Sequence, residues 1–394
     1  METVKRIVYF LHSPLTKFDE ERFGISTFIE NGFEVEVWEF TPFLTYDRYV
    51  NYTTSHKADF ETRYIFHSKR DIISAISQLT GNCLIISMLF YNFKTIFIYR
   101  EIARLGILYC KVFYNHPLNY NHPDFNKSKR RSLYDRVKNL TMGELKGTVF
   151  ARIPRKYLGI SPPDYLIVGG GDFDLSKLHI DEGTKIIRTH TLDYDSYLRD
   201  LKNPGAIDDK MAVFLDQYEP FHPDNYQPGG MVISPDEYYP LICRFFDYLQ
   251  QNHSIHIVIA AHPRSDYANR PDYFGGRPVV LGKTVELVRK SKLVILHYSY
   301  AMNLGIIYKK PMIFVTMDCL EKSQIKAFGD RLINYQALLI GKRPLNLNET
   351  FDVDLAKELV VNEDLYERYK NIYIKMKGTD DIPTWQNLIN HLRA

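Results

Sequence analysis

Short apolar runs alternate with helical stripes from the start of the chain, and this order most constrains the fold. Residues 7–11 form a continuous apolar run, residues 18–31 carry apolar side chains at helical spacing, and residues 35–40 again resemble a strand. A strand that is apolar throughout is typical of a parallel sheet covered on both faces, and parallel neighbours need a crossover helix. The order therefore predicts an α/β fold.

The same order continues along both halves of the chain, which predicts two domains. A length of 394 residues exceeds one ordinary core, and the polar segment 201–209 contains Pro-Gly, as expected of a linker. We expect two Rossmann-like, doubly wound domains facing each other across a cleft, over residues 1–200 and 210–375. Residues 376–394 are expected to form a helix that could pack back on the first domain. Further strands are expected at 83–90, 108–114, 165–168, 185–189, 211–215, 255–261, 293–296 and 311–316.

Charge, cysteines and hydropathy exclude several classes of protein. Fifty Lys and Arg against 47 Asp and Glu leave a formal charge of +3, too little for a chain that neutralises many phosphates, so we expect no nucleic-acid partner. The four cysteines show no CxxC spacing, and we expect neither a metal nor a cofactor. Without a signal-peptide pattern or an apolar stretch of roughly 20 residues, the protein is expected to be cytoplasmic.

Two further clusters are candidate sites. Lys127 and residues 129–131 are basic; one interpretation is peripheral contact with anionic lipid at the inner face of the membrane, and the favoured one is a solvated surface. His116 and His122 each precede a proline in a loop with one nearby carboxylate, so we predict no metal site there.

Ligands of doubly wound folds bind beyond the carboxyl ends of the strands, which directs attention to residues just after strands. His262-Pro263-Arg264 follows the apolar run 255–261. A histidine there can hydrogen-bond a phosphate or a base, and an arginine can pair with a phosphate. A surface turn that contains a histidine would give the same pattern.

A second motif of this kind is His297-Tyr298-Ser299-Tyr300, between the expected strand 293–296 and a helix expected at 301–308. Ser299 is expected to cap that helix, whose N-terminus would be an anion site. The serine could equally serve as a cap alone. Gly305 would allow the helix to approach the sheet closely.

Asp216 and Gln217 directly follow the first strand of the second half. They are candidates for contact with the donor or the acceptor. A polar loop beside the hinge explains them equally well.

The order of the two motifs resembles the C-terminal half of GT-B glycosyltransferases, most closely bacterial sialyltransferase-like and capsule-type enzymes that use CMP-activated sugars. The resemblance covers residues 211–316 in motif detail, and the two-domain layout fits the whole chain. It implies that His262 and Pro263 contact cytidine monophosphate and that Ser299 holds its phosphate. The predicted nucleotide-binding set is His262, Pro263, Arg264, His297, Tyr298, Ser299 and Tyr300.

An inverting reaction in the resembled enzymes needs a base that deprotonates the acceptor hydroxyl, often in an Asp/Glu-Asp-Gly motif after a strand. Asp172 follows the expected strand 165–168, whereas Asp181-Glu182-Gly183 is close to the motif in letters but precedes a strand. Asp172 is therefore favoured over Asp181 and Glu182. His12, after the first strand, is a further candidate, because other GT-B families place a base there.

The resemblance thus implies a metal-independent glycosyltransferase of surface-polysaccharide synthesis. The expected donor is a nucleotide sugar, with a CMP-linked acidic sugar favoured and a UDP or GDP sugar as the alternative. The expected acceptor is a glycan or a lipid-linked glycan, and the expected mechanism is a single inverting displacement. A non-catalytic two-lobed subunit that binds a nucleotide or a glycan is the alternative from another class.

Overall fold

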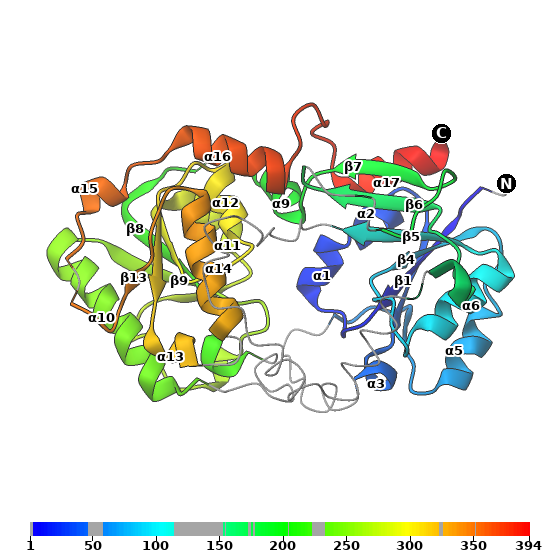
Figure 1. The fold of residues 1–394 in the computed structure, drawn as a ribbon, viewed down its shortest axis with the longest axis horizontal. Coiled ribbons are helices and arrows are strands. Elements are labelled where there is room, and N and C mark those ends of the chain that lie inside the picture. The colour runs from blue at the N-terminus through cyan, green and yellow to red at the C-terminus, as the bar shows by residue number, and fades with distance from the viewer. Residues whose placement is uncertain are drawn as a thin grey trace. The chain divides into compact units, whose positions relative to one another are not determined.

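The computed structural model describes residues 3–45, 58–113, 153, 155–171, 175, 178–203, 205–222, 233–322, 326–350 and 352–394 (Figure 1). By their contacts, the described residues divide into two compact units. The first contains those up to Thr189 together with Ile382–Ala394, and the second contains His190–Asp381. No helix among the described residues is both long and apolar enough to cross a membrane.

A seven-stranded parallel sheet forms the centre of the first unit. Its order is β3-β2-β1-β4-β5-β6-β7, and every neighbouring pair is parallel. The strands are β1 (Arg6–Leu11), β2 (Glu34–Glu39), β3 (Arg63–Ile65), β4 (Cys83–Ser87), β5 (Leu108–Phe113), β6 (Tyr165–Gly169) and β7 (Lys185–Thr189). The helices are α1 (Lys17–Arg22), α2 (Ile25–Glu30), α3 (Thr41–Leu44), α5 (Lys69–Ile76), α6 (Ile96–Leu105) and α17 (Thr384–Arg393).

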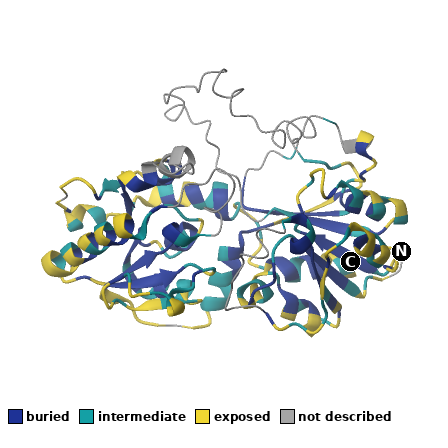
Figure 2. Cartoon of the chain, turned by 90° about the horizontal axis from the view of Figure 1, so that it is seen from below, coloured by how far each residue is buried: buried dark blue, intermediate teal, exposed yellow. Residues whose placement is uncertain are grey.

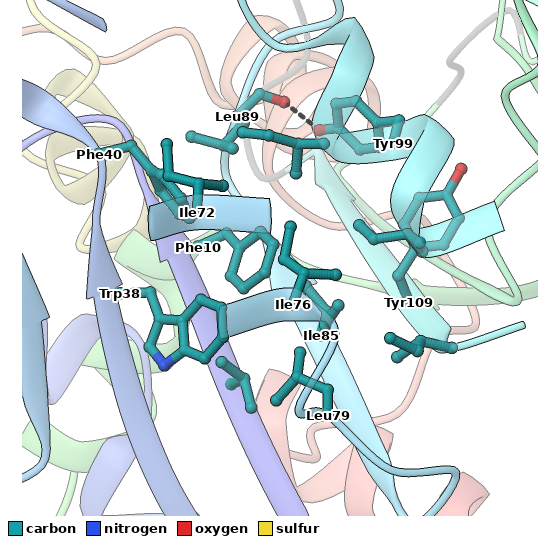
Figure 3. Close-up of a cluster of buried hydrophobic side chains, with 14 of the residues drawn as sticks. Phe10, Trp38, Phe40, Ile72, Ile76, Leu79, Ile85, Leu89, Tyr99 and Tyr109 are labelled. Atoms are coloured by element: carbon teal, nitrogen blue, oxygen red, sulfur yellow. Dashed lines mark hydrogen bonds between the residues drawn. The ribbon is translucent and has the colours of Figure 1, made fainter. Parts of the chain in front are cut away.

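Alternation along the strands divides the core of the first unit between the two faces of its sheet. In β1, Val8 and Phe10 pack in one cluster with residues of α5 and α6 (Figure 3), while Ile7 and Tyr9 pack in the other with residues of α2 and α17. Figure 2 shows buried residues along the strands and exposed residues on the outer surfaces of the helices. Both faces are thus covered, which explains why β1 is apolar from Ile7 to Leu11.

The single helix expected at 18–31 is two helices, α1 and α2, separated at Gly24. Gly24 has the left-handed value φ 63°, and a Cβ atom there would lie 2.2 Å from Cδ1 of Trp385. Only glycine fits both the backbone conformation and the contact. The prediction of one continuous helix was therefore wrong, because a side chain of α17 occupies the position.

A six-stranded parallel sheet forms the centre of the second unit, in the order β10-β9-β8-β11-β12-β13. In both sheets the strand order, taken along the chain, contains the 3-2-1-4-5-6 order of a Rossmann fold. The strands are β8 (Asp208–Leu215), β9 (His256–Ala261), β10 (Val279–Leu281), β11 (Ser291–Leu296), β12 (Met312–Thr316) and β13 (Leu345–Asn346). The helices are α9 (Leu192–Asp200), α10 (Pro235–His253), α11 (Thr284–Lys290), α12 (Met302–Ile307), α13 (Asp318–Lys322), α14 (Lys326–Leu339), α15 (Leu355–Glu358) and α16 (Glu363–Tyr369).

The division between the units lies before α9, whereas the sequence placed the end of the first domain at residue 200. Helix α9 packs within the second unit: Asp193 Oδ2 accepts from Asn303 Nδ2 of α12 at 2.8 Å, and Asp200 pairs with Arg289 of α11 at 2.7 Å. The polar segment after Asp200 thus leads into β8 of the same unit. Helix α17, in turn, packs on α2 and β7 of the first unit.

Candidate functional site

Each sheet has a point where the strand order reverses direction, and ligands of doubly wound folds bind at the carboxyl ends of the strands there. In the second unit this point lies between β8 and β11, and in the first between β1 and β4. In the second unit, the residues predicted from sequence follow β8, β9 and β11, which are neighbours in the sheet. Adjacent strands are about 4.8 Å apart, so the turns after β9 and β11 begin about 10 Å apart.

Asp216 follows β8 and joins its turn to the turn after β9. Its carboxylate accepts from the backbone N–H of Tyr218 at 3.0 Å, from the N–H of His262 at 3.4 Å and from the hydroxyl of Tyr267 at 3.0 Å. The residue is only 3% exposed. Asp216, expected to contact donor or acceptor, therefore holds the His-Pro turn in place from inside the protein, while Gln217 is half-buried.

Burial also shifts the pKa values of two carboxyl groups in this turn. It raises the pKa of Asp216 from 3.8 to about 6, although the hydrogen bonds oppose the shift. Glu219, in the same turn, is 4% exposed, and burial raises its pKa from 4.5 to about 7; a hydrogen bond from Tyr298 opposes this shift and the charge of Asp216 adds to it. Two carboxyl groups that titrate near neutral pH therefore lie at the switch point, a pattern that often marks functional sites.

Replacing Asp216 by asparagine tests whether burial raises the pKa of this carboxyl group. Asp216 binds its proton more tightly in the folded chain than at its ordinary pKa of 3.8, so folding becomes less favourable as pH rises from 3.8 to about 6. Asp216→Asn removes this titration, and the decline in the free energy of unfolding should shrink by about 2–3 kcal/mol. Urea unfolding followed by circular dichroism across this range measures it, and an unchanged slope would contradict the assignment.

His262 presents a hydrogen-bond donor at the carboxyl end of β9. Its Nδ1 accepts from the backbone N–H of Arg264 at 3.2 Å, so the neutral ring carries its proton on Nε2. Burial, with His222 and Arg264 nearby, lowers the pKa of His262 to about 3 and keeps the ring neutral. Among the described residues, neither Nε2 of His262 nor the guanidinium of Arg264 has a hydrogen-bonded acceptor, and Pro263 between them is exposed.

His297 lies in the core, although it directly follows β11. Its Nδ1 donates to the carbonyl of Val315 at 2.6 Å, and its Nε2 accepts from the hydroxyl of Tyr238 at 2.9 Å. The residue has no exposed surface, and burial lowers its pKa to about 4. Because both ring nitrogens have protein partners, His297 supports the turn and is not available to a ligand.

Ser299 is held by the side chain of Gln336 from α14. Gln336 accepts from the N–H of Ser299 at 3.0 Å and donates to its carbonyl at 3.2 Å, while the Ser299 hydroxyl accepts from the N–H of Ala301 at 3.0 Å. The helix that follows starts later than expected: α12 spans Met302–Ile307 with Ala301 as its N-cap residue. Ser299 therefore precedes the cap by two residues, and no described residue accepts its hydroxyl proton.

The neighbouring tyrosines differ in exposure, and the helix behind them packs closely on the sheet. Tyr298 is half-buried, whereas Tyr300 is 45% exposed. A Cβ atom on Gly305 of α12 would lie 2.9 Å from Sδ of Met312 in β12, so the helix approaches the sheet closely at this residue.

In the first unit, His12 lies at the switch point, directly after β1. Its ring centroid is 5.5 Å from that of Phe90, which follows β4 and is 69% exposed. The loop after His12 is anchored by the buried Glu39, which accepts from the N–H of Leu15 at 2.6 Å and pairs with Arg63 at 2.9 Å. His12 is thus held next to an exposed aromatic ring.

The other base candidates do not lie at that edge. Asp181 and Glu182 are exposed in the turn before β7, and Asp181 Oδ1 accepts from the N–H of Gly183 at 3.0 Å. The carboxyl ends of all the strands, including β1 and β4, point to the opposite edge of this parallel sheet. Asp172 lies outside the described residues, as do Lys127, residues 129–131, His116 and His122.

Three residues outside the predicted site set contribute to this arrangement. Glu219 lies in the loop after β8, where its polarity alone did not indicate burial. Tyr267 and Gln336 bind Asp216 and Ser299 from segments far away in sequence. The local signal for Glu219 is a polar residue four positions after Leu215, the last residue of β8, whereas Tyr267 and Gln336 carry no local signal of this kind.

Comparisons with known proteins address the fold. No protein-family model matches the chain, and no curated protein matches it significantly. Among solved structures, the wall teichoic acid polymerase TagF has 15% identity and a TM-score of 0.50, over 98% of this chain and 88% of its own. A UDP-GlcNAc 2-epimerase from Methanocaldococcus jannaschii has 12% identity and a TM-score of 0.45, over 98% and 99% of the two chains. With its two parallel sheets, the chain has a GT-B-type fold of two Rossmann-like domains.

Proposed function

We propose that this protein transfers a sugar from a nucleotide-activated donor, a CMP-linked acidic sugar in the favoured case, to a glycan or lipid-linked glycan. The observation that carries the proposal is a set of hydrogen-bond donors after β9 and β11 that have no acceptor among the described residues. Nε2 of His262, the Arg264 guanidinium and the Ser299 hydroxyl have no described acceptor, and Gln336 fixes the backbone of Ser299. Such donors suit a phosphate that carries negative charge.

These donors would act by stabilising the leaving group. In a single inverting displacement, the acceptor oxygen bonds to the anomeric carbon while the bond to the phosphate oxygen breaks, and negative charge grows on the departing phosphate. Preorganised donors stabilise that charge because they need no reorientation during the reaction. His262 is suited to this role because its backbone is fixed by Asp216 and its ring is neutral with the proton on Nε2.

The acceptor hydroxyl needs a base, and His12 of the first unit is our described candidate. It lies at the switch point beside the exposed ring of Phe90, which offers an apolar face on which a sugar ring can stack. Asp172 remains the alternative base. Asp181 and Glu182 are set aside because they lie at the amino edge of the sheet.

Nucleotide binding is tested by thermal shift with CMP, UDP and GDP. We expect at least one nucleotide, CMP in the favoured case, to raise the melting temperature of the wild type. His262→Ala and Ser299→Ala should each weaken its affinity about 10-fold to 100-fold, the value of a hydrogen bond to a charged group. His256→Ala is the matched control, because His256 lies at the amino end of the same strand β9.

The outcomes separate the candidate functions. If none of the three nucleotides shifts the melting temperature, the proposal fails. If a nucleotide binds but no transfer from its sugar is detected, the protein belongs to the non-catalytic class of nucleotide-binding subunits. Equal affinity in the wild type and in both alanine variants would remove His262 and Ser299 from the site.

A further inference from the structure

The turn after β8 contains two buried carboxyl groups, and the described partners of one of them are all neutral. Asp216 and Glu219 are 3% and 4% exposed. Among the described residues, Asp216 accepts only from backbone N–H groups and from the Tyr267 hydroxyl. A buried carboxylate is ordinarily paired with a cation, because burial strongly disfavours an isolated charge. Burial accordingly raises the pKa of Asp216, although the hydrogen bonds that it accepts oppose the shift.

Both carboxyl groups bond to turns on which the nucleotide is proposed to bind. Asp216 binds the N–H of His262 after β9, and Glu219 accepts from the hydroxyl of Tyr298 after β11, next to Ser299. Tyr218, between the two acids, has the left-handed value φ 56°, a strained conformation for a non-glycine residue. A phosphate held by His262 and Ser299 would thus contact a partner of Asp216 directly and lie one residue away from Tyr298, the partner of Glu219.

The other ionisable groups about the pair are weak acids and a neutral histidine. Helix α10 supplies Tyr238 and Tyr239, and α13 supplies Cys319, all of which interact electrostatically with one or both carboxyl groups. The turn after β9 supplies Tyr267 and His262, with Arg264 and His222 beyond them near His262. Burial raises the pKa of the tyrosines and the thiol and lowers that of His262. The two acids therefore titrate nearer neutral pH than the tyrosines, the thiol and His262 do.

We propose that nucleotide binding on the turns after β9 and β11 is coupled to the uptake of a proton by the Asp216–Glu219 pair. This inference rests on the proposed function and adds a regulation of the same site. A phosphate brings negative charge close to two buried carboxyl groups, and repulsion between like charges is strong where water is excluded. One proton on the pair removes a negative charge, so the protonated pair binds the anion more tightly. Burial sets the pKa of Asp216 at about 6 and of Glu219 at about 7, so the proton is available under ordinary conditions.

Isothermal titration calorimetry measures this coupling directly. CMP, or whichever of UDP and GDP gives the larger thermal shift, is titrated at pH 7 in buffers with different enthalpies of ionisation. The dependence of the observed heat on the buffer gives the number of protons taken up. We expect the wild type to take up a substantial fraction of a proton per nucleotide, and Glu219→Gln to take up clearly less. Protonation of the nucleotide phosphate is common to both proteins and cancels in the comparison.

The affinity of the Glu219→Gln variant separates this coupling from a merely structural role. Glutamine mimics the protonated acid, so the variant should bind the nucleotide at about pH 8 as tightly as the wild type does at about pH 6. As pH rises over this range, the affinity of the wild type alone should fall by up to about tenfold per pH unit. Glu237→Gln, which changes an exposed carboxylate in the first turn of α10, should behave like the wild type. Tyr298→Phe keeps both acids and removes a hydrogen bond that lowers the pKa of Glu219, so its proton uptake should move to higher pH.

Two results would overturn the inference and are distinguishable. If the wild type, Glu219→Gln and Asp216→Asn all bind the nucleotide and all take up the same number of protons, the coupling is absent while the proposed function stands. If the wild type binds no nucleotide, the proposed function and the inference fail together. Should Glu219→Gln not fold, Tyr298→Phe decides, because an unshifted pH dependence of affinity in that variant contradicts the role of Glu219.

Discussion

Replacing Trp385 by alanine should lower the free energy of unfolding of the first unit by about 3–5 kcal/mol, the range for a buried aromatic side chain in a core. Trp385 is 3% exposed and packs against Tyr9 and Phe28, with ring centroids 6.0 and 5.8 Å away. Its Nε1 donates to the carbonyl of Arg22 at 2.8 Å. The variant loses this packing, leaves that carbonyl without its donor and opens a cavity beside Gly24.

Urea unfolding followed by tryptophan emission measures this effect in one unit. The chain has two tryptophans, and Trp38 in β2 lies in the first unit with Trp385, so Trp38 remains as the probe in the variant. Trp385→Phe is the matched variant, and it should lose less because the smaller ring retains most of the packing. A loss below about 1 kcal/mol in Trp385→Ala would show that α17 contributes little to the core.

Replacing His12 by alanine should reduce the rate of sugar transfer by about 100-fold to 10,000-fold, the range for the loss of a general base. The thermal shift caused by the nucleotide should stay unchanged, because His12 lies in the first unit and the proposed nucleotide contacts lie in the second. The rate is measured as nucleotide released from a CMP-linked acidic sugar in the presence of a glycan acceptor. Asp181→Asn is the matched control and should keep full activity, because Asp181 lies at the amino edge of the sheet.

Asp172→Asn decides between the two base candidates. If His12→Ala retains full activity and Asp172→Asn abolishes transfer, Asp172 is the base. If both variants remain fully active, the base lies elsewhere. A loss of activity in Asp181→Asn as large as that in His12→Ala would contradict the argument from the edges of the sheet.

Much of the fold could be predicted from sequence because buried parallel strands are apolar throughout. The expected strands at 7–11 and 185–189 correspond to β1 and β7. The strands that the prediction missed, β3, β10 and β13, have two or three residues each and lie at or next to the edges of their sheets. Strands this short give a weak sequence signal: β3 and β13 mix polar with apolar residues, and β10 is a run of only three apolar residues. The break between α1 and α2 could not be predicted either, because its cause is Trp385.

The candidate site, too, could be predicted from sequence only in part. The order of motifs at strand ends could be read from sequence, because topology alone places the ends of parallel strands along one edge. The direction of a side chain could not, so His262 and His297 looked equivalent although only His262 has a ring nitrogen without a described partner. The burial of Asp216 and Glu219 was likewise hidden, since it depends on Tyr267 and Tyr298, which come from other turns.

Helix α17 also constrains the order in which the chain matures during translation. The strands of the first unit leave the ribosome early, yet the helix that fills one face of their sheet is synthesised only after the whole second unit. Until then, Ile25, Phe28 and the apolar ring of Tyr9 lack the cover that Trp385, Leu388 and Ile389 provide. The second unit can therefore complete its core first, while the first unit waits with one face of its sheet incompletely covered.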